Sequence, residues 1–259
     1  MSIKTLRHTG RIVVKVGSSS VSGENSAQIQ TLVDALAALR GDGCEVILVS
    51  SGAIATGVPL LGLETRPTDL ATQQAAAAVG QNMLINNYQE ALSRHGLIAG
   101  QILLTPGDFE EEESRFNAKN ALHRLLQLGV LPIVNENDTV ATREIRFGDN
   151  DRLAALVARL IGADQLVLLS DVDALYTAPP HEPGAARITF VPFGDDLDQV
   201  RIGEAKSGWG TGGALTKVAA ARMAANSGCE VVLTNTKLLP ALVAGEQHGT
   251  WFAARPWNS

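Results

Sequence analysis

Apolar, largely β-branched runs alternate along the chain with longer segments rich in Ala, Leu and Gln, and this alternation constrains the fold more than any other feature. Most of the runs lack a polar residue at every second position, which is typical of strands buried on both faces of a mostly parallel sheet. The expected strands are Arg11–Val16, Glu45–Val49, Leu97–Leu103, Val130–Val134, Gln165–Leu169 and Glu230–Leu233. The expected helices are Ala27–Arg40, Leu70–Ser93, Phe116–Leu128, Asp151–Ile161, Gly213–Ala225 and Leu238–Ala244. This order predicts a doubly wound α/β fold, a three-layer α/β/α sandwich with a mostly parallel central sheet.

The segments between these elements suggest one domain with irregular loops. Left-handed helix ends are expected at the glycine-containing turns Gly41-Asp42-Gly43, His95-Gly96, Gly129 and Gly162. No long linker rich in Pro, Gly or Ser divides the chain, so a single domain over residues 1–259 is expected. We interpret Thr177–Gly184 and Gly203–Gly213 as surface loops, and the acids Glu110–Glu113 as a solvated loop before the helix at Phe116.

Composition and charge exclude several classes of protein. With 45% hydrophobic and 19% charged residues the chain resembles a globular enzyme, and its net charge of -6 argues against a broad nucleic-acid surface. No segment reaches the roughly 18 apolar residues of a transmembrane helix, and the N-terminus lacks the hydrophobic region of a secretory signal. Cys44 and Cys229 lack metal-ligand spacing and are expected in the core. These features predict a soluble cytoplasmic protein.

One segment, Val134–Asp151, is dense in Asn, Asp, Glu and Arg, and it joins an expected core strand to an expected helix. Asn and Asp disfavour the interiors of helices and strands, because their side chains compete for backbone hydrogen bonds. Such a cluster at a strand end is typical of a site that binds a small, charged, amine- or hydroxyl-bearing molecule. The structural alternative is an acidic surface hairpin with a helix cap.

Two further strand ends have residues suited to anions. Lys15 is followed by Gly17 and by the hydroxyls of Ser18–Ser20, so a phosphate could meet a positive charge, a closely approaching backbone and hydroxyl donors. Ser50-Ser51-Gly52 follows the next expected strand, and its small residues expose backbone N–H groups. The structural alternatives are a solvated lysine at the rim of the sheet and an ordinary tight turn.

The stretch Gly208–Lys217 matches the letters of the dinucleotide fingerprint GxGxxG but lacks its context. No apolar strand precedes it, and Glu230, which lies at the fitting distance, begins a strand instead of ending one. It is not a Walker A loop either, because Lys217 follows Thr216 without the GK[ST] order. We interpret it as a flexible glycine loop that leads into a helix, with Lys217 able to reach the terminal phosphates of a nucleotide. A dehydrogenase would depend on the rejected fingerprint, and failure to bind NAD would exclude it.

A fourth strand end, Leu168–Tyr176, carries Ser170, Asp171 and Asp173. These side chains suit an adenosine or a magnesium ion, and an aspartate that caps a turn is the structural alternative. The chain has no GxSxG elbow and no HExxH pair, so nothing indicates a hydrolase. We interpret each histidine as a surface or core residue, since they are dispersed in sequence at His8, His95, His123, His181 and His248.

Taken in order, these segments resemble the amino acid kinase family, and within it the branch that acts on L-glutamate. The resemblance covers essentially the whole chain and depends on the joint presence of VVKVGSSSV, VSSGAIATG, QAAAAVGQ, VNENDTVA, FGDNDRLAALVA, SDVDALYT and GTGGALTK. Carbamate, uridylate and aspartate kinases share the opening Lys-Gly loop but are not similar in the joint NEND and GDND pair. The combination is therefore specific, although no single block is.

The resemblance implies ATP-dependent transfer of the γ-phosphoryl group to the side-chain carboxylate of L-glutamate, the first step of proline biosynthesis, with Mg²⁺ on the ATP phosphates. By position, Lys15 and Lys217 are expected to flank the transferred group and Asp151 to orient both lysines. The residues expected to hold glutamate are Ser51, Gly52, Asn135, Asp138 and Asn150. Those expected to hold ATP are Lys15, Gly17, Ser18, Ser170, Asp171, Thr211, Gly212, Gly213, Ala214, Leu215, Thr216 and Lys217.

The resemblance also carries expectations about organisation. The N-terminal part is expected to bind mainly glutamate, and the part from residue 162 onward mainly ATP. The chain ends soon after GTWFAARP, so no C-terminal PUA domain is expected. A homo-oligomer, inhibition by proline and transfer of the product to a glutamyl phosphate reductase are further expectations. Two alternatives stay open: a kinase of another amino acid or acid metabolite, and a non-catalytic nucleotide-binding regulatory protein, which the presence of Lys15, Asp151 and Lys217 disfavours.

Overall fold

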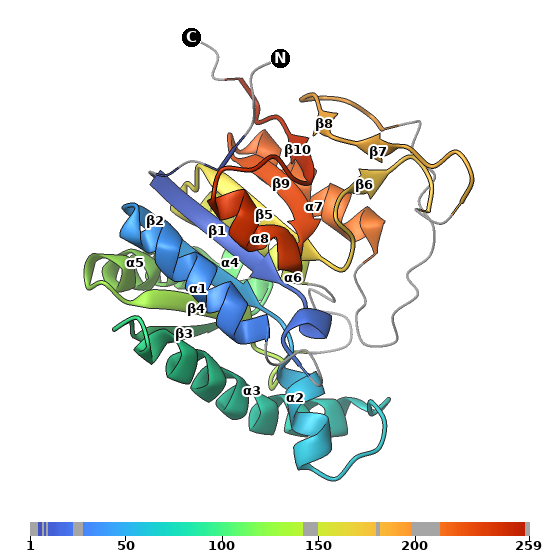
Figure 1. Cartoon of the computed structure of the whole chain (residues 1–259). Coiled ribbons are helices and arrows are strands. Elements are labelled where there is room, and N and C mark those ends of the chain that lie inside the picture. Colours follow the sequence, from blue (N-terminus) through green and yellow to red (C-terminus); the bar gives the residue numbers. More distant parts are fainter. Residues whose placement is uncertain are drawn as a thin grey trace.

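The computed structural model describes residues 5–6, 8, 10–22, 28–141, 150–179, 182–197 and 213–256. At its centre is an eight-stranded sheet with the strand order β3-β4-β2-β1-β5-β9-β10-β8 (Figure 1). Neighbouring strands pair in parallel except β9 and β10, which are antiparallel. The strands are β1 (Gly10–Val16), β2 (Cys44–Ser50), β3 (Ala99–Leu104), β4 (Leu131–Glu136), β5 (Gln165–Ser170), β8 (Phe190–Val191), β9 (Glu230–Asn235) and β10 (Thr250–Phe252).

Helices cover both faces of this sheet (Figure 1). One hydrophobic cluster joins one face to α1 (Gln28–Gly41), α3 (Leu70–Ser93) and α8 (Leu239–Val243). A second cluster joins the other face to α5 (Glu112–Gln127), α6 (Asn150–Ile161) and α7 (Ala214–Asn226). Successive residues of β1 alternate between the two clusters, as Val13 and Val14 show, because strand side chains point to opposite faces. The predicted three-layer sandwich with a mostly parallel sheet is therefore confirmed.

Each of the six expected strands and six expected helices has a counterpart, with most boundaries within two residues of those predicted. Glycines with positive φ end several helical segments, as expected, at Gly43, Gly96, Gly129 and Gly162. Cys44 and Cys229 are buried in the two hydrophobic clusters. No helix within the described ranges is both long and apolar enough to cross a membrane. The loop predicted at Gly203–Gly213 lies outside the described residues except for Gly213.

Several short elements were not predicted. They are the 3-10 turns η1 (Ser18–Ser20) and η3 (Thr236–Leu238), the helices α2 (Ala53–Leu60) and α4 (Gly107–Glu110), the strands β8 and β10, and the hairpin of β6 (Leu175–Tyr176) and β7 (Arg187–Ile188). The strands among them are only two or three residues long, and α2 contains Gly57 and Pro59, so none has a clear periodic pattern.

The interpretation of Glu110–Glu113 as a loop was wrong. Glu110 closes α4, Glu111 is the N-cap of α5, and α5 begins at Glu112, four residues before the predicted start. The Glu111 carboxylate accepts hydrogen bonds from the N–H groups of Glu113 and Ser114. Hydrogen bonding by the Ser114 side chain, and then by its backbone N–H, lowers the pKa of Glu111. Acidic side chains stabilise the positive end of a helix, so a run of acids can begin a helix while remaining exposed.

The topology makes the carboxyl end of β1 the expected position of a ligand site. From β1 the chain continues to β2 on one side, while β5, later in sequence, pairs with β1 on the other. In open α/β sheets a crevice forms at the carboxyl ends of the strands where the strand order reverses in this way. The predicted site segments follow the carboxyl ends of β1, β2, β4 and β5.

Candidate active site

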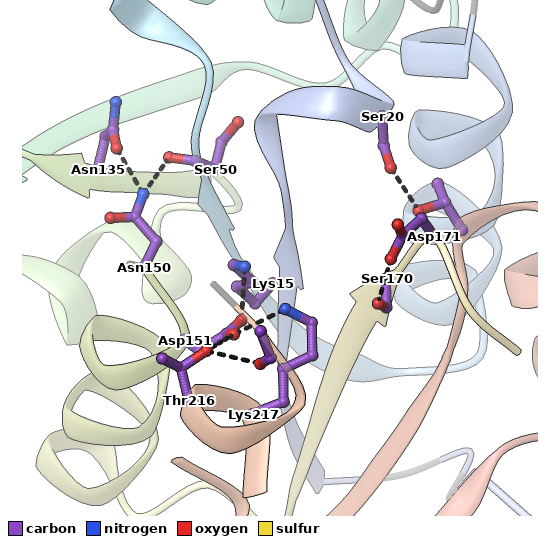
Figure 2. A network of polar contacts seen from close by, with 12 residues as sticks. Lys15, Ser20, Ser50, Asn135, Asn150, Asp151, Ser170, Asp171, Thr216 and Lys217 are labelled. Carbon is purple, nitrogen blue, oxygen red and sulfur yellow. Dashed lines mark hydrogen bonds and ion pairs between the residues drawn. The ribbon is translucent and has the colours of Figure 1, made fainter. Parts of the chain in front are cut away.

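Polar side chains from four parallel strands and two helices meet at this edge of the sheet (Figure 2). The helices α6 and α7 begin here, so their first turns face the strand ends. The residues are Lys15 of β1, Ser50 of β2, Asn135 of β4, Ser170 of β5, Asn150 and Asp151 of α6, and Thr216 and Lys217 of α7.

Asp151 lies between two lysines at the centre of this group. Its Oδ1 is 2.5 Å from Lys15 Nζ, and its Oδ2 is 2.9 Å from Lys217 Nζ (Figure 2). Asp151 is fully buried, and Lys15 and Lys217 are only 3% and 8% exposed. The structure thus brings together the three residues expected to be catalytic, although they come from three separate elements.

Among these three described residues, two ammonium groups share one carboxylate. Burying ions costs several kcal/mol each, and close pairing offsets this cost only if the geometry is good. Lys217 also lies in the first turn of α7, where the helix dipole disfavours a cation. Two buried ammonium groups at the carboxyl edge of the sheet suit a site that binds an anion such as a phosphate.

The start of α7 supports this cluster. Gly213 is the N-cap, and Thr216 Oγ1 donates a hydrogen bond to its carbonyl oxygen at 2.9 Å. Thr216 Oγ1 also lies 3.3 Å from Asp151 Oδ2. The first turn begins with Ala214 and Leu215, and the Leu215 side chain is 64% exposed. Two other residues predicted to bind ATP here, Thr211 and Gly212, lie outside the described residues.

Three side-chain amides form a buried network beside the charged cluster. Asn150 Nδ2 donates to Ser50 O at 2.9 Å and to Asn135 Oδ1 at 2.7 Å, and Asn135 Nδ2 donates to Gln81 Oε1 at 2.7 Å. The backbone N–H of Glu136 also donates to Asn135 Oδ1, at 2.8 Å. A backbone N–H can only donate and a carbonyl can only accept, so these contacts fix the direction of both asparagine amides. Both N–H bonds of Asn150 are used, and a ligand can meet only its oxygen.

The turn after β2 lies against the turn after β1. The N–H of Ser51 donates to Val16 O at 3.1 Å, and Gly52 is the N-cap of α2 with φ of 113°. A Cβ at Gly52 would lie 3.2 Å from Val21 Cγ2, so conformation and space both favour glycine. The small residues therefore start a helix at the site, and its first backbone N–H groups have no partner within the helix.

The last predicted glutamate-binding residue, Asp138, lies half-buried in the turn that follows β4. The end of this turn is held to α3, because Gln74 Nε2 donates to Ala141 O at 3.2 Å. Residues 142–149, most of the remaining polar segment, lie outside the described residues. The polar segment thus contributes Asn135 and Asn150 to the amide network from its two ends, and Asp138 lies between them in sequence.

The predicted ATP-binding residues Ser170 and Asp171 lie apart from the amide network in Figure 2, across the charged cluster. Ser170 Oγ donates to Asp171 Oδ1 at 3.0 Å, and Asn235 Nδ2 donates to Asp171 O at 2.7 Å. Nearby, Ser20 Oγ and Thr236 Oγ1 form a 2.9 Å hydrogen bond. The turns after β1, β5 and β9 are therefore tied together on this side.

Gly17 and Ser18 form the start of the turn after β1. Gly17 has extended backbone angles that any residue adopts, with φ of −82°. Among the described residues, the atoms nearest to a Cβ built at Gly17 are Lys15 Nζ and Ser19 Oγ, both at 4.0 Å. No contact with a described residue therefore requires a glycine here.

Sequence analysis missed several polar residues that complete the site. Gln81 and Tyr88 reach it from α3, with the Tyr88 hydroxyl 2.8 Å from Ser50 Oγ. Burial raises the pKa of the Tyr88 phenol, so it stays protonated. Asn235 and Thr236 support the opposite side of the cluster through their bonds to Asp171 and Ser20. The available signal was spacing, since the polar residues of α3 that reach toward the site recur every seven residues, at Gln74, Gln81 and Tyr88, and so share one helix face.

The comparison with known families matches residues 10–235 to the amino acid kinase family. The chain is 66% identical to the glutamate 5-kinase of Clavibacter michiganensis subsp. michiganensis over 245 residues, which cover 95% of each protein. It is 66% identical to the glutamate 5-kinase of Leifsonia xyli subsp. xyli, over 96% of this chain and 92% of that protein. The match to the glutamate 5-kinase of Streptomyces coelicolor, at 54% identity, covers 94% of this chain and 67% of that protein.

Among solved structures, the fold is similar to that of carbamate kinase from Giardia lamblia bound to AMP-PNP. The TM-score is 0.67 at 16% sequence identity, and the match covers 95% of this chain and 99% of the other. At this identity the likeness concerns the fold alone. The family match and the high identity to its relatives carry the assignment: the chain belongs to the amino acid kinase family, within which it groups with the glutamate 5-kinases.

Proposed function

We propose that the protein transfers the γ-phosphoryl group of ATP to the side-chain carboxylate of L-glutamate and forms L-glutamyl 5-phosphate, the first step of proline biosynthesis. The identity to glutamate 5-kinases supports the substrates and the pathway. The structural observation that carries the reaction type is the buried cluster of Lys15, Asp151 and Lys217, in which two ammonium groups contact one carboxylate. A carboxylate oxygen attacks the γ-phosphorus, the bond from that phosphorus to the β–γ bridging oxygen breaks, and ADP leaves.

The chemistry of the substrates explains why this site contains lysines and needs no histidine. The glutamate side chain has an ordinary pKa of about 4.3, so the nucleophile is already ionised at neutral pH. The obstacle is the repulsion between a carboxylate and a polyphosphate. Positioning and cationic stabilisation supply most of the catalysis in such transfers. In our proposal Lys15 and Lys217 flank the transferred group, and Asp151 holds the two ammonium groups in place.

The direction of the Asn150 amide supports a site for the ammonium group of an amino acid. Because both of its N–H bonds are donated to Ser50 and Asn135, Asn150 offers a ligand only an acceptor. We propose that Asn150 Oδ1 and the Asp138 carboxylate receive the substrate's ammonium group, with Asn135 completing the pocket. Ser51 and Gly52, at the start of α2, complete the proposed glutamate site.

The proposed ATP site lies on the other side of the cluster. Gly17, Ser18 and the start of α7, with the loop from Thr211 to Lys217, hold the phosphates, and Ser170 and Asp171 hold the adenosine part. Glutamate then binds mainly to the N-terminal part of the chain, and ATP mainly to the part from residue 162 onward. Hydrogen bonds from neighbouring residues support both proposed sites. Gln81 and Tyr88 bond to residues of the glutamate site, and Asn235 and Thr236 bond to the turns of the ATP site.

The residues present fit a magnesium ion that arrives with ATP. Within the described ranges no group of three or more His, Cys, Asp or Glu could hold a metal. Mg²⁺ commonly keeps several waters and binds through substrate phosphates with one or two carboxylates. Asp171 is the carboxylate in the proposed ATP site that suits this role. The ion supplies charge neutralisation on the phosphate oxygens.

Further proposals follow from the family alone. They are a cytoplasmic location, a homo-oligomer, inhibition by proline, and transfer of the unstable product to a glutamyl phosphate reductase. Sedimentation velocity and inhibition assays with proline test the second and third directly: a monomer at micromolar concentration, or turnover unchanged by proline, would contradict them.

ADP release tests the substrate proposal. Purified protein with ATP and Mg²⁺ is assayed with L-glutamate, L-aspartate, acetate, carbamate and no acceptor. We expect release that depends on L-glutamate. Release with another acid only would indicate a different kinase on the same fold. ATP binding without release for any acid would indicate a regulatory protein.

A further inference from the structure

We propose that Gln81 is a positioning residue for glutamate, which holds the Asn135 amide and, through it, Asn150. The inference goes beyond the proposed function but depends on its placement of glutamate at Asn135 and Asn150. Gln81 lies on α3, is 8% exposed, and reaches Asn135 with its Oε1 at 2.7 Å.

The hydrogen bonds form a chain with one direction. Gln81 accepts from Asn135, Asn135 accepts from Asn150, and Asn150 donates its second N–H to Ser50 O. Asn135 is only 2% exposed, so water cannot easily replace the acceptor that Gln81 provides. If the Gln81 side-chain oxygen is removed, the Asn135 N–H loses its acceptor. A buried donor without an acceptor raises the free energy of the folded protein. The Asn135 side chain then rotates to seek another acceptor and releases Asn150.

The backbone behind Gln81 is held firmly. The preceding residue, Gly80, contacts α2 so closely that a Cβ there would lie 1.8 Å from Ala53 O and 2.5 Å from the backbone nitrogen of Gly57. Tyr88, seven residues after Gln81 on the same helix, is joined to Ser50 by a hydrogen bond between the Tyr88 hydroxyl and Ser50 Oγ. The helix backbone that carries Gln81 is therefore held in place on both sides. This lets the Gln81 side chain set the position of the Asn135 amide.

The contacts of Gln81 also predict which kinetic constant it controls. Its side-chain hydrogen bond to Asn135 belongs to the amide network, whereas Lys15, Asp151 and Lys217 form a separate group of ion pairs. Loss of the bond should weaken the binding of glutamate and leave ATP binding and the transfer step almost unchanged.

The test is Gln81→Met, which keeps the length of the side chain but removes the acceptor. We expect the KM for glutamate to rise by about 5- to 100-fold, the range for a buried donor that loses its partner, with kcat and the KM for ATP within about twofold of the wild type. Should Gln81→Met fail to fold, Gln81→Asn keeps the amide but shortens it by one methylene, and the same selective rise is expected.

The matched control is Gln89→Met on the same helix. Gln89 accepts from Ala99 N at 2.9 Å and donates to Leu97 O at 3.2 Å, at the start of β3 and away from the amide network. The Gln89→Met substitution should lower the melting temperature without changing the KM for glutamate. An unchanged KM for glutamate in Gln81→Met, or an equal rise of that KM in Gln89→Met, would overturn the inference. If the wild type shows no glutamate-dependent turnover, the proposed function itself has failed.

Discussion

At the scale of single residues, the decisive feature is that one carboxylate, that of Asp151, contacts two buried lysines. Lys15 and Lys217 hold opposite oxygens of the same carboxylate. Removing either lysine leaves Asp151 paired with the other lysine, whereas removing the carboxylate takes a shared partner from both ammonium groups. Substitutions within one cluster should therefore separate catalysis from stability.

Replacing Lys217 should impair catalysis but not folding. We expect Lys217→Ala to lower kcat by a factor on the order of 10²–10³, as for the loss of one group that stabilises transition-state charge. Lys15 and Asp151 remain paired, so the circular dichroism spectrum should be unchanged. Lys119→Ala, at an exposed position of α5, is the control and should retain full activity. Turnover like that of the wild type in Lys217→Ala would remove this residue from the mechanism.

Replacing Asp151 should impair folding. Asp151→Asn leaves Lys15 and Lys217 buried without their shared carboxylate, and breaking a buried ion pair in this way typically costs about 3–5 kcal/mol. Urea denaturation should show a lower free energy of unfolding than that of Lys217→Ala. Equal stability of the two variants would contradict the proposed role of Asp151 as the group that holds the lysines.

At the scale of elements, α2 and α3 pack through glycines. A Cβ at Gly57 would lie 1.9 Å from Ala76 O, and one at Gly80 would lie 1.8 Å from Ala53 O. Small side chains let two helix backbones touch, and no flexible side chain is available to yield. This contact fixes α3, which carries Gln81 and Tyr88 to the amide network.

A methyl group in this contact should affect both stability and the glutamate site. Gly80→Ala forces α2 and α3 apart, and overpacking of this kind typically costs about 1–3 kcal/mol. The KM for glutamate should rise because Gln81 moves with the backbone. The control Gly41→Ala adds a Cβ in the last turn of α1 that meets no atom of the described residues within 4 Å. It should leave stability unchanged or raise it by up to about 1 kcal/mol. Equal effects of the two substitutions would show that the contact does not position α3.

At the scale of the whole molecule, the charged cluster at the carboxyl edge of β1 separates the two proposed ligand sites. The amide network draws on α3, β2, β4 and α6, and the nucleotide side draws on the turns after β1, β5 and β9 and on α7. One fold therefore presents two different surfaces that meet at Lys15, Asp151 and Lys217.

Hydrogen exchange should resolve these two surfaces. Glutamate should slow amide exchange in α3 and at the end of β4, whereas AMP-PNP should slow it in α7 and in the turn after β5. A ligand that binds only the folded state at 100 times its Kd adds about 2.7 kcal/mol of stability, enough to be measured. Protection of the same peptides by both ligands would contradict the division at residue 162.

The sequence predicted the long elements well because their patterns are local. Unbroken apolar runs such as Gln165–Leu169 are sufficient to indicate a buried parallel strand. The short strands β8 and β10 were missed, because their pairing depends on neighbours far away in sequence. The start of α5 was misplaced, because the stabilising effect of acids at a helix N-terminus was given too little weight.

Only those residues of the candidate site whose residue type and position in a motif indicate a chemical role could be predicted from the sequence. Lys15, Asp151 and Lys217 came from strand-end and loop motifs together with the family resemblance, and the structure brings them together. Gln81 could not be found in this way, because its role depends on which side chain faces it across α3 and β4. A glutamine in an alanine-rich helix is ordinary until its partner is known.

The most direct test of the account is to trap the product with hydroxylamine and identify it by mass spectrometry. Wild-type protein, ATP, Mg²⁺ and L-glutamate should form γ-glutamyl hydroxamate, because hydroxylamine attacks an acyl phosphate at the carboxyl carbon. Lys217→Ala should form it at least about 100-fold more slowly. ADP release from the wild type without hydroxamate, or hydroxamate formed equally by both proteins, would contradict phosphoryl transfer to glutamate by this cluster.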